Sequence, residues 1–207
     1  MTRARDEGIK LMTFNCDSEN KMLREACFWA DSFSQGVVAG KAAAEAVNKE
    51  GTVGILMGRT NVLGNVDRNR GFRDYLRNIK GVKIAEEVSV DDDANDVYTK
   101  TVEWLGREKD IKVLFLTNGF LEAAARAIVD AGMEGQTSVI GFDICPELIP
   151  YVQSGVIYTV INQDAFGQGH DPIVYMYNHV VDNVPYPSEY ISARSSIVDK
   201  RNVSDLL

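Results

Sequence analysis

A chain of 207 residues is long enough for one large or two small domains, and its 45% apolar content can supply their cores. The 30 acidic residues outnumber the 22 basic ones, giving a formal net charge of -8. This balance argues against direct nucleic-acid binding, because phosphate recognition needs clustered Lys and Arg. No run approaches the ~18 consecutive apolar residues that span a bilayer.

Strands and helices are expected to alternate along the chain. Residues 1–8 are predicted to form the last part of a helix, which Gly8 closes in the left-handed C-cap conformation. Strands are expected at 9–14, 51–58, 82–90, 112–117, 137–142, 157–162 and 188–198. Helices are expected at 37–47, 67–78, 94–109, 120–132, 146–154 and 167–182, with Ser32 and Gln35 as a capping box before the first. This alternation predicts an α/β fold with a mostly parallel sheet flanked by helices.

Polar side chains follow four of the apolar segments, at the point where each is expected to end. They are Asn15 and Asp17, Asn118, Asp143, and Gln163. In an open parallel α/β sheet, small ligands bind in the crevice beyond the carboxyl ends of the strands. Amides and carboxylates can hydrogen-bond hydroxyl groups, so this set suits a sugar or another polyol.

One arginine and three aromatic residues add to this candidate site. Arg68 lies at the start of the helix expected after the loop 58–66. Its five N–H donors could bind vicinal hydroxyls or a carboxylate. A surface salt bridge is an equally good alternative role for this residue. Phe14, Trp29 and Phe142 lie beside the polar strand-end residues, where a ring can stack on a sugar face. Any one of these rings alone is more typical of a core residue.

Other motifs point away from catalysis, metals and cofactors. Gly51, Gly54 and Gly58 have neither the dinucleotide-site nor the P-loop spacing. The three cysteines lack short-spaced pairs, only two histidines are present, and no GxSxG elbow occurs. The acidic run 91–96 lacks the order of an EF-hand and is expected to be a solvated loop and helix start, although one of its residues could line the cleft. We therefore expect a protein that is not an enzyme, with no catalytic residue, metal site or cofactor.

The order and spacing of these motifs resemble the type I periplasmic sugar-binding proteins, a family that includes the effector-binding cores of lac-repressor-like regulators. The motifs are residues 12–17, Arg68-x-x-Gly71-Phe72, Thr117-Asn118, 139–143, 161–163 and 168–178. The resemblance implies two α/β lobes that close on a ligand. It also implies that Arg68, Asn118, Phe142, Asp143 and Gln163 contact the ligand from the C-terminal lobe, and Asn15 and Asp17 from the N-terminal lobe.

The chain departs from this family in two respects. Asn15 and Cys16 stand where an acid or Arg is usual, and about three strand-helix units that normally begin the N-terminal lobe are absent. We expect an N-lobe remnant at 1–32, a complete C-terminal lobe at 33–162, and a return segment with hinge and tail at 163–207. Hinge crossings are expected near 30–32, 163–164 and 193–194. The partial lobe would leave an apolar edge and face exposed, which favours a homodimer through that lobe.

The predicted function is non-catalytic binding of a monosaccharide or related polyol by hinge closure, for transport or sensing. A membrane permease or a receptor is the expected protein partner, and the expected location is periplasmic or extracellular. The first residues carry basic groups but no apolar run behind them, so they do not form a signal peptide, and a cytoplasmic location stays open. Two alternatives remain: the effector core of a lac-repressor-like regulator, and the extracellular sensor domain of a chemoreceptor or kinase.

Overall fold

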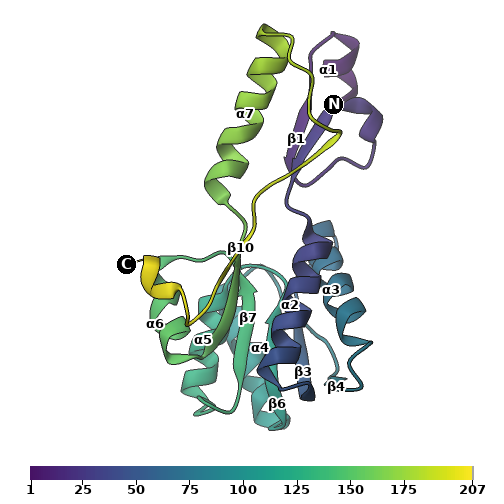
Figure 1. Ribbon diagram of the computed structural model, residues 1–207. Coiled ribbons are helices and arrows are strands. Elements are labelled where there is room, and N and C mark those ends of the chain that lie inside the picture. Colours follow the sequence, from purple (N-terminus) through teal and green to yellow (C-terminus); the bar gives the residue numbers. More distant parts are fainter. Residues whose placement is uncertain (207) are drawn as a thin grey trace. The chain divides into compact units, whose positions relative to one another are not determined.

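The chain divides into two compact units in the computed structural model, which describes residues 1–206 (Figure 1). Unit 1 comprises Met1–Asp31 and Gln163–Ser196, and unit 2 comprises Ser32–Asn162 with the residues from Ile197 onward. No helix of residues 1–206 has the length and apolar character needed to cross a membrane.

Unit 1 is built on a small parallel sheet with the strand order β1-β2-β9. The strands are β1 (Met12–Asn15), β2 (Ala26–Trp29) and β9 (Tyr190–Ser192). The helices are α1 (Thr2–Asp6), the short 3-10 helix η1 (Lys21–Leu23) and α7 (Ala165–Val181). Helix α7 packs against β1 and β2. Gly8 has a φ of 74°, so the predicted left-handed residue after the first helix is confirmed.

Unit 2 contains a larger sheet with the strand order β10-β8-β7-β6-β3-β4, to which β5 adds by pairing with β3. The strands are β3 (Glu50–Met57), β4 (Gly81–Ile84), β5 (Val88–Ser89), β6 (Ile111–Leu116), β7 (Ser138–Phe142), β8 (Ile157–Asn162) and β10 (Ser196–Val198). The helices are α2 (Ser32–Ala46), α3 (Leu63–Leu76), α4 (Ala94–Arg107), α5 (Leu121–Asp130) and α6 (Ile149–Ser154), with the 3-10 helices η2 (Pro146–Leu148) and η3 (Val203–Leu206). Pairing is parallel from β4 through β8, so the predicted α/β fold class is confirmed.

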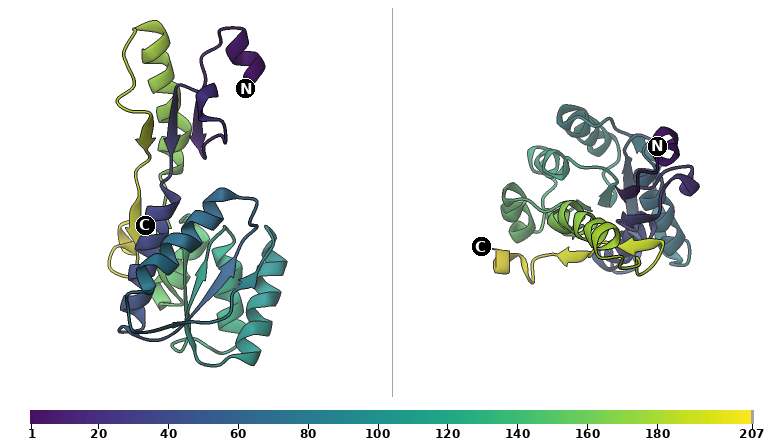
Figure 2. Two further views of the ribbon diagram at one scale, coloured as in Figure 1. Left: turned by 90° about the vertical axis from the view of Figure 1, so that its right-hand side faces the viewer. Right: turned by 90° about the horizontal axis from the view of Figure 1, so that it is seen from above.

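Helices cover both faces of the unit 2 sheet (Figure 2). Alternate strand residues enter two separate cores. Along β6, Val113 and Phe115 join the core beneath α2 and α3, whereas Leu114 and Leu116 join the core beneath α4 and α5. Side chains of a strand point to opposite faces in turn, so a strand covered on both faces is apolar throughout. This explains the continuous apolar run in the sequence.

The α2–α3 contact depends on glycines. A Cβ atom on Gly36 would lie 2.1 Å from the backbone oxygen of Arg68, and one on Gly71 would lie 2.1 Å from that of Phe33. The two helices therefore pack backbone to backbone at a distance that no larger residue allows. This contact fixes the part of α3 that carries Arg68.

Several expected elements differ from the structure. The four-residue strand β2 was not predicted as an element, because its apolar run is too short to show a period. The strand expected at 82–90 is divided into β4 and β5, and the one expected at 188–198 into β9 and β10, which lie in different sheets. Helix α3 begins at Leu63, earlier than the expected residue 67. Strand β8 has the predicted bounds.

Candidate functional site

The carboxyl ends of β6, β7 and β8 lie side by side in unit 2, because these strands are neighbours in one parallel sheet. Asn118 lies just beyond β6, Phe142 ends β7, and Asp143 follows it directly. Arg68 reaches the same edge from α3, where its Nη1 donates to the backbone oxygen of Thr117 at 2.8 Å. The structure thus brings four of the predicted residues together at one edge of the sheet.

Arg68 is half-buried and held against an aromatic ring. Its guanidinium carbon lies 3.8 Å from the ring centroid of Phe142. Burial lowers the pKa of Arg68 to about 10, and the charge of Asp143 opposes this change. The side chain remains a cation at neutral pH, but it is partly desolvated. A desolvated, stacked guanidinium is a preorganised hydrogen-bond donor for hydroxyl or carboxylate oxygens.

Asn118 is 5% exposed and has a fixed orientation. Its Nδ2 donates to Asp92 Oδ1 at 2.9 Å and to the backbone oxygen of Asp91 at 3.3 Å. Its Oδ1 is buried and has no hydrogen-bond donor among residues 1–206. A buried acceptor without a donor costs roughly 1–3 kcal/mol, so the site is suited to a ligand that supplies the missing donor.

Close approach to Asn118 requires Gly58, the first residue after β3. A Cβ atom there would lie 2.9 Å from the Cβ of Asn118 and 2.6 Å from the Nδ2 of Asn65. The backbone N–H of Gly58 donates to the Thr117 hydroxyl at 2.9 Å. The glycine that follows this strand in the sequence therefore leaves room for the side chains of Asn65 and Asn118.

Asp143 and Asn15 share an unusual backbone conformation at the ends of β7 and β1. Their φ angles are 65° and 66°, in the left-handed region, which Asn and Asp tolerate better than other residues with a Cβ atom. Both side chains are exposed. The chain turns sharply at each strand end and presents a polar side chain there.

Asp17 occupies a hydrogen-bond network inside unit 1. Its carboxylate accepts bonds from Arg24 at 2.6 and 2.9 Å, from the Thr13 hydroxyl at 2.9 Å and from the Tyr190 hydroxyl at 2.9 Å. The Arg24 hydrogen bonds hold the pKa of Asp17 well below its usual range, against the opposing effect of burial. Arg24 also donates to Glu189 at 2.9 Å. The structure thus gives Asp17 a structural role, and its expected ligand contact stays a prediction.

Sequence reasoning missed Arg24, whose side chain is 1% exposed. Its carboxylate partners lie 7 and 165 residues away, a separation that carries no local pattern.

Asn15 lies opposite Trp29 in the β1–β2 register, so the ends of these two strands meet. Gln163 directly follows β8 and is 8% exposed, and its backbone oxygen accepts from the Gln168 side chain at 2.8 Å. Asn15 and Gln163 both belong to unit 1.

Within residues 1–206, no group of three or more His, Cys, Asp or Glu side chains is placed to hold a metal ion. Cys16, Cys27 and Cys145 are free thiols. The site described above consists of hydrogen-bonding groups and one aromatic ring.

Comparison with known proteins gives a family and a set of similar structures. The family described as periplasmic binding protein domain matches residues 1–183. The glucose-galactose binding protein GanP from Geobacillus stearothermophilus is 25% identical with a TM-score of 0.86, covering 97% of this chain and 71% of GanP. An ABC transporter solute binding protein from Agrobacterium vitis, with bound tagatopyranose, is 22% identical with a TM-score of 0.88, covering 99% of this chain and 71% of its own. A XylFII-LytSN complex is 25% identical with a TM-score of 0.76, covering 97% of this chain and 71% of its own. No curated protein sequence matches the chain.

Proposed function

The chain belongs to the periplasmic binding protein family, and we propose that it binds a monosaccharide or related polyol without catalysing a reaction. The observation that carries the proposal is the strand-end cluster of unit 2. A stacked guanidinium, an amide oxygen with no donor among residues 1–206 and an exposed carboxylate lie at one edge of the sheet. Closely spaced donors and acceptors of this kind match the alternating hydroxyls of a sugar.

Each residue has a distinct part in the proposed recognition. Arg68 donates to ligand oxygens, while Asn118 Oδ1 and Asp143 accept from ligand hydroxyls. Asn15 and Gln163, which belong to unit 1, stay predicted ligand contacts, and hinge closure stays the predicted mode of binding. Buried polar groups left unpaired would reject an analogue that lacks the matching hydroxyl.

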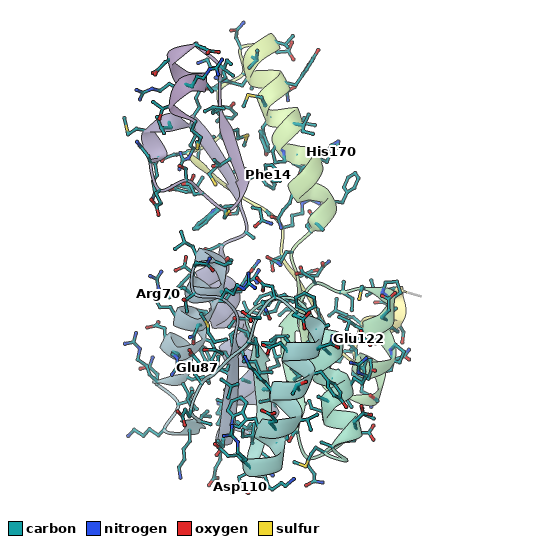
Figure 3. The ribbon with its side chains drawn as sticks, turned by 180° about the vertical axis from the view of Figure 1, so that it is seen from behind. Phe14, Arg70, Glu87, Asp110, Glu122 and His170 are labelled. Carbon is teal, nitrogen blue, oxygen red and sulfur yellow. The ribbon has the colours of Figure 1, made fainter. Side chains whose placement is uncertain are left out.

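Isothermal titration calorimetry with a sugar panel tests this function. The panel follows the ligands of the similar structures: D-glucose, D-galactose, D-tagatose, D-allose, D-arabinose and myo-inositol. We expect micromolar binding of at least one of them by the wild-type protein. The double variant Asn118→Ala, Asp143→Ala should lose that binding, and Asp110→Ala, before β6 and labelled in Figure 3, should keep it. Micromolar binding by the double variant would overturn the site assignment.

Transport and sensing are two outputs of the same binding event. Solute binding for an ABC transporter is the first candidate, because such proteins are prominent among the similar structures. Sensing is the second candidate, in which a receptor and not a permease is the partner, and one similar structure, XylFII-LytSN, is a complex with a second protein. The genes that flank this reading frame distinguish the two: a permease and an ATPase support transport, and a sensor kinase or chemoreceptor supports sensing.

We place the protein in the periplasm or outside the cell, as its family implies. Immunoblotting of cell fractions from the source organism tests this location. Recovery in the cytoplasmic fraction alone would instead favour the core of a transcription regulator.

We also propose that the apolar face of unit 1 joins two copies of the chain. Strand β1 is an edge strand, and a groove beside it is lined by Met12, Phe14, Pro172, Ile173, Met176, Tyr177, Val180 and Val181. Phe14 is 57% exposed and Ile173 is 69% exposed. Figure 3 labels Phe14 on β1. The lining is uncharged in a chain of net charge -8, so two identical chains meet there with least repulsion.

Light scattering on a size-exclusion column tests the dimer. We expect the wild-type mass to be twice that of one chain, and Ile173→Lys to halve it. Phe166→Lys is the matched control, because Phe166 is 79% exposed on the same helix but does not line the groove. A wild-type monomer at high concentration would overturn the dimer without affecting the sugar-binding proposal.

A further inference from the structure

The orientation of the Asn118 amide is set by its neighbours. Both groups that face its nitrogen, Asp92 Oδ1 and the backbone oxygen of Asp91, are acceptors. An amide turned the other way would put its oxygen against two oxygens, so only one orientation is compatible with these contacts. The amide oxygen must then lie on the side away from the Asp91–Asp92 loop.

Asp92 is the side chain that imposes this orientation. One of its carboxylate oxygens accepts from Asn118 at 2.9 Å, and the other lies 3.9 Å from Arg59 Nε. Asp91 contributes differently, because only its backbone oxygen contacts Asn118 while its carboxylate accepts from Arg59 at 3.2 Å. Two adjacent acids thus share one arginine, but only one of them places its side chain against the amide.

We propose that Asp92 is a positioning residue, which holds the Asn118 amide so that its oxygen is presented to the ligand as an acceptor. The inference rests on the proposed function and deepens it. The ligand preferred at this point is a polyol whose hydroxyl donates a hydrogen bond to Asn118 Oδ1, the buried acceptor that has no donor among the described residues. A ligand that offers only an acceptor at this position is rejected, because two oxygens would then face each other.

Removing the Asp92 side chain should leave the fold intact. Its side chain is 41% exposed, and exposed ion pairs such as the one with Arg59 contribute little to stability. Asp91→Ala is a closely matched control. Like Asp92→Ala, it removes one carboxylate next to Arg59. It keeps two backbone hydrogen bonds: the Asp91 N–H still donates to Asp96, and the Asp91 oxygen still accepts from Asn118.

The first measurement uses the protein without ligand. In ¹⁵N NMR spectra, the Asn118 side-chain NH₂ pair is identified by its disappearance in Asn118→Ala. We expect Asp92→Ala to shift this pair and to speed its hydrogen exchange about tenfold, as loss of one hydrogen bond implies. Asp92→Asn, whose amide oxygen can still accept, and Asp91→Ala should keep the wild-type signals. Unchanged signals in Asp92→Ala would overturn the positioning role.

The second measurement is calorimetric titration with D-galactose and D-glucose. Asp92→Ala should weaken the affinity about tenfold, Asp92→Asn by less than about threefold, and Asp91→Ala by less than about twofold. Equal losses in Asp91→Ala and Asp92→Ala would show a general charge effect and overturn the inference. A wild-type protein that binds no sugar of the panel would overturn the proposed function, while the NMR measurement would still decide whether Asp92 orients the amide.

Discussion

The guanidinium carbon of Arg68 lies 3.8 Å from the ring centroid of Phe142, and the two side chains come from different elements, α3 and the end of β7. Phe142 is itself held in the core, where it meets Phe115 edge-on with ring centroids 6.0 Å apart. The ring therefore cannot move to follow a displaced cation. This pair ties a charged group of the candidate site to the packing of the unit 2 sheet.

Replacing Arg68 by Lys keeps the charge but removes the planar group that stacks on Phe142. We expect sugar affinity to fall by roughly 10- to 50-fold, because an ammonium offers neither the fork of donors nor the same stacking. Arg70→Lys is the control, since Arg70 is exposed and lies 5.0 Å from the ring of Phe33 (Figure 3). Equal affinities of Arg68→Lys and the wild type in calorimetry would contradict this role.

A methyl group at Gly36 should destabilise unit 2. Its Cβ atom would lie 2.1 Å from the Arg68 backbone oxygen, so α2 and α3 must separate at a cost of roughly 2–4 kcal/mol in the free energy of unfolding. Gly106→Ala is the opposite case, because Gly106 lies in α4 with nothing within 4 Å of its added Cβ. That variant should gain roughly 0.5–1 kcal/mol from the higher helix propensity of Ala. Urea unfolding followed by circular dichroism measures both changes.

The Asp17–Arg24 pair should make the stability of unit 1 depend on pH. The pKa of Asp17 is lower in the folded than in the unfolded state, so its stabilisation is complete above the unfolded pKa of about 4. It is lost as the pH falls through the lower, folded pKa. Asp17→Asn should therefore reduce the free energy of unfolding by about 2–3 kcal/mol at pH 7 and by less below pH 4.

Urea titrations at pH 7 and pH 3 measure this difference. The control is Asp6→Asn, because Asp6 is exposed and its nearest cation, Arg5, lies at 3.9 Å. A destabilisation by Asp17→Asn that is the same at both pH values would show that the charge of Asp17 is not its source.

The three free thiols should react with iodoacetamide in a defined order. Cys16 is exposed and should react first; Cys145 is also exposed, but burial of its thiol raises its pKa and should slow it. Cys27 lies buried in β2, where burial also raises the pKa, and it should react only when unit 1 opens. Mass spectrometry of peptides after timed labelling gives the order. Early labelling of Cys27 would mean that the β1-β2-β9 sheet is open in solution.

The sequence determined the fold class and the polar strand ends. Strands buried on both faces must be apolar throughout, so 113–116 could be recognised from composition and length alone. Residues that follow such strands must lie at the carboxyl edge of the sheet, which is why Asn118 and Asp143 could be expected there. These are local properties of the chain, and a single sequence records them.

The groups that those residues contact depend on how the elements pack in three dimensions. Arg24 donates to Asp17, 7 residues away, and to Glu189, 165 residues away. Asn118 donates to Asp92, which lies 26 residues before it in the chain. The expected strand at 188–198 became β9 and β10 because its two halves pair with different sheets. Hydrogen-bond partners at such separations are fixed by how the elements pack, and no periodicity in the chain encodes them. The sequence thus placed polar groups at the strand ends, and packing decided that Asp17 is held by Arg24 and that the Asn118 oxygen is left unpaired among the described residues.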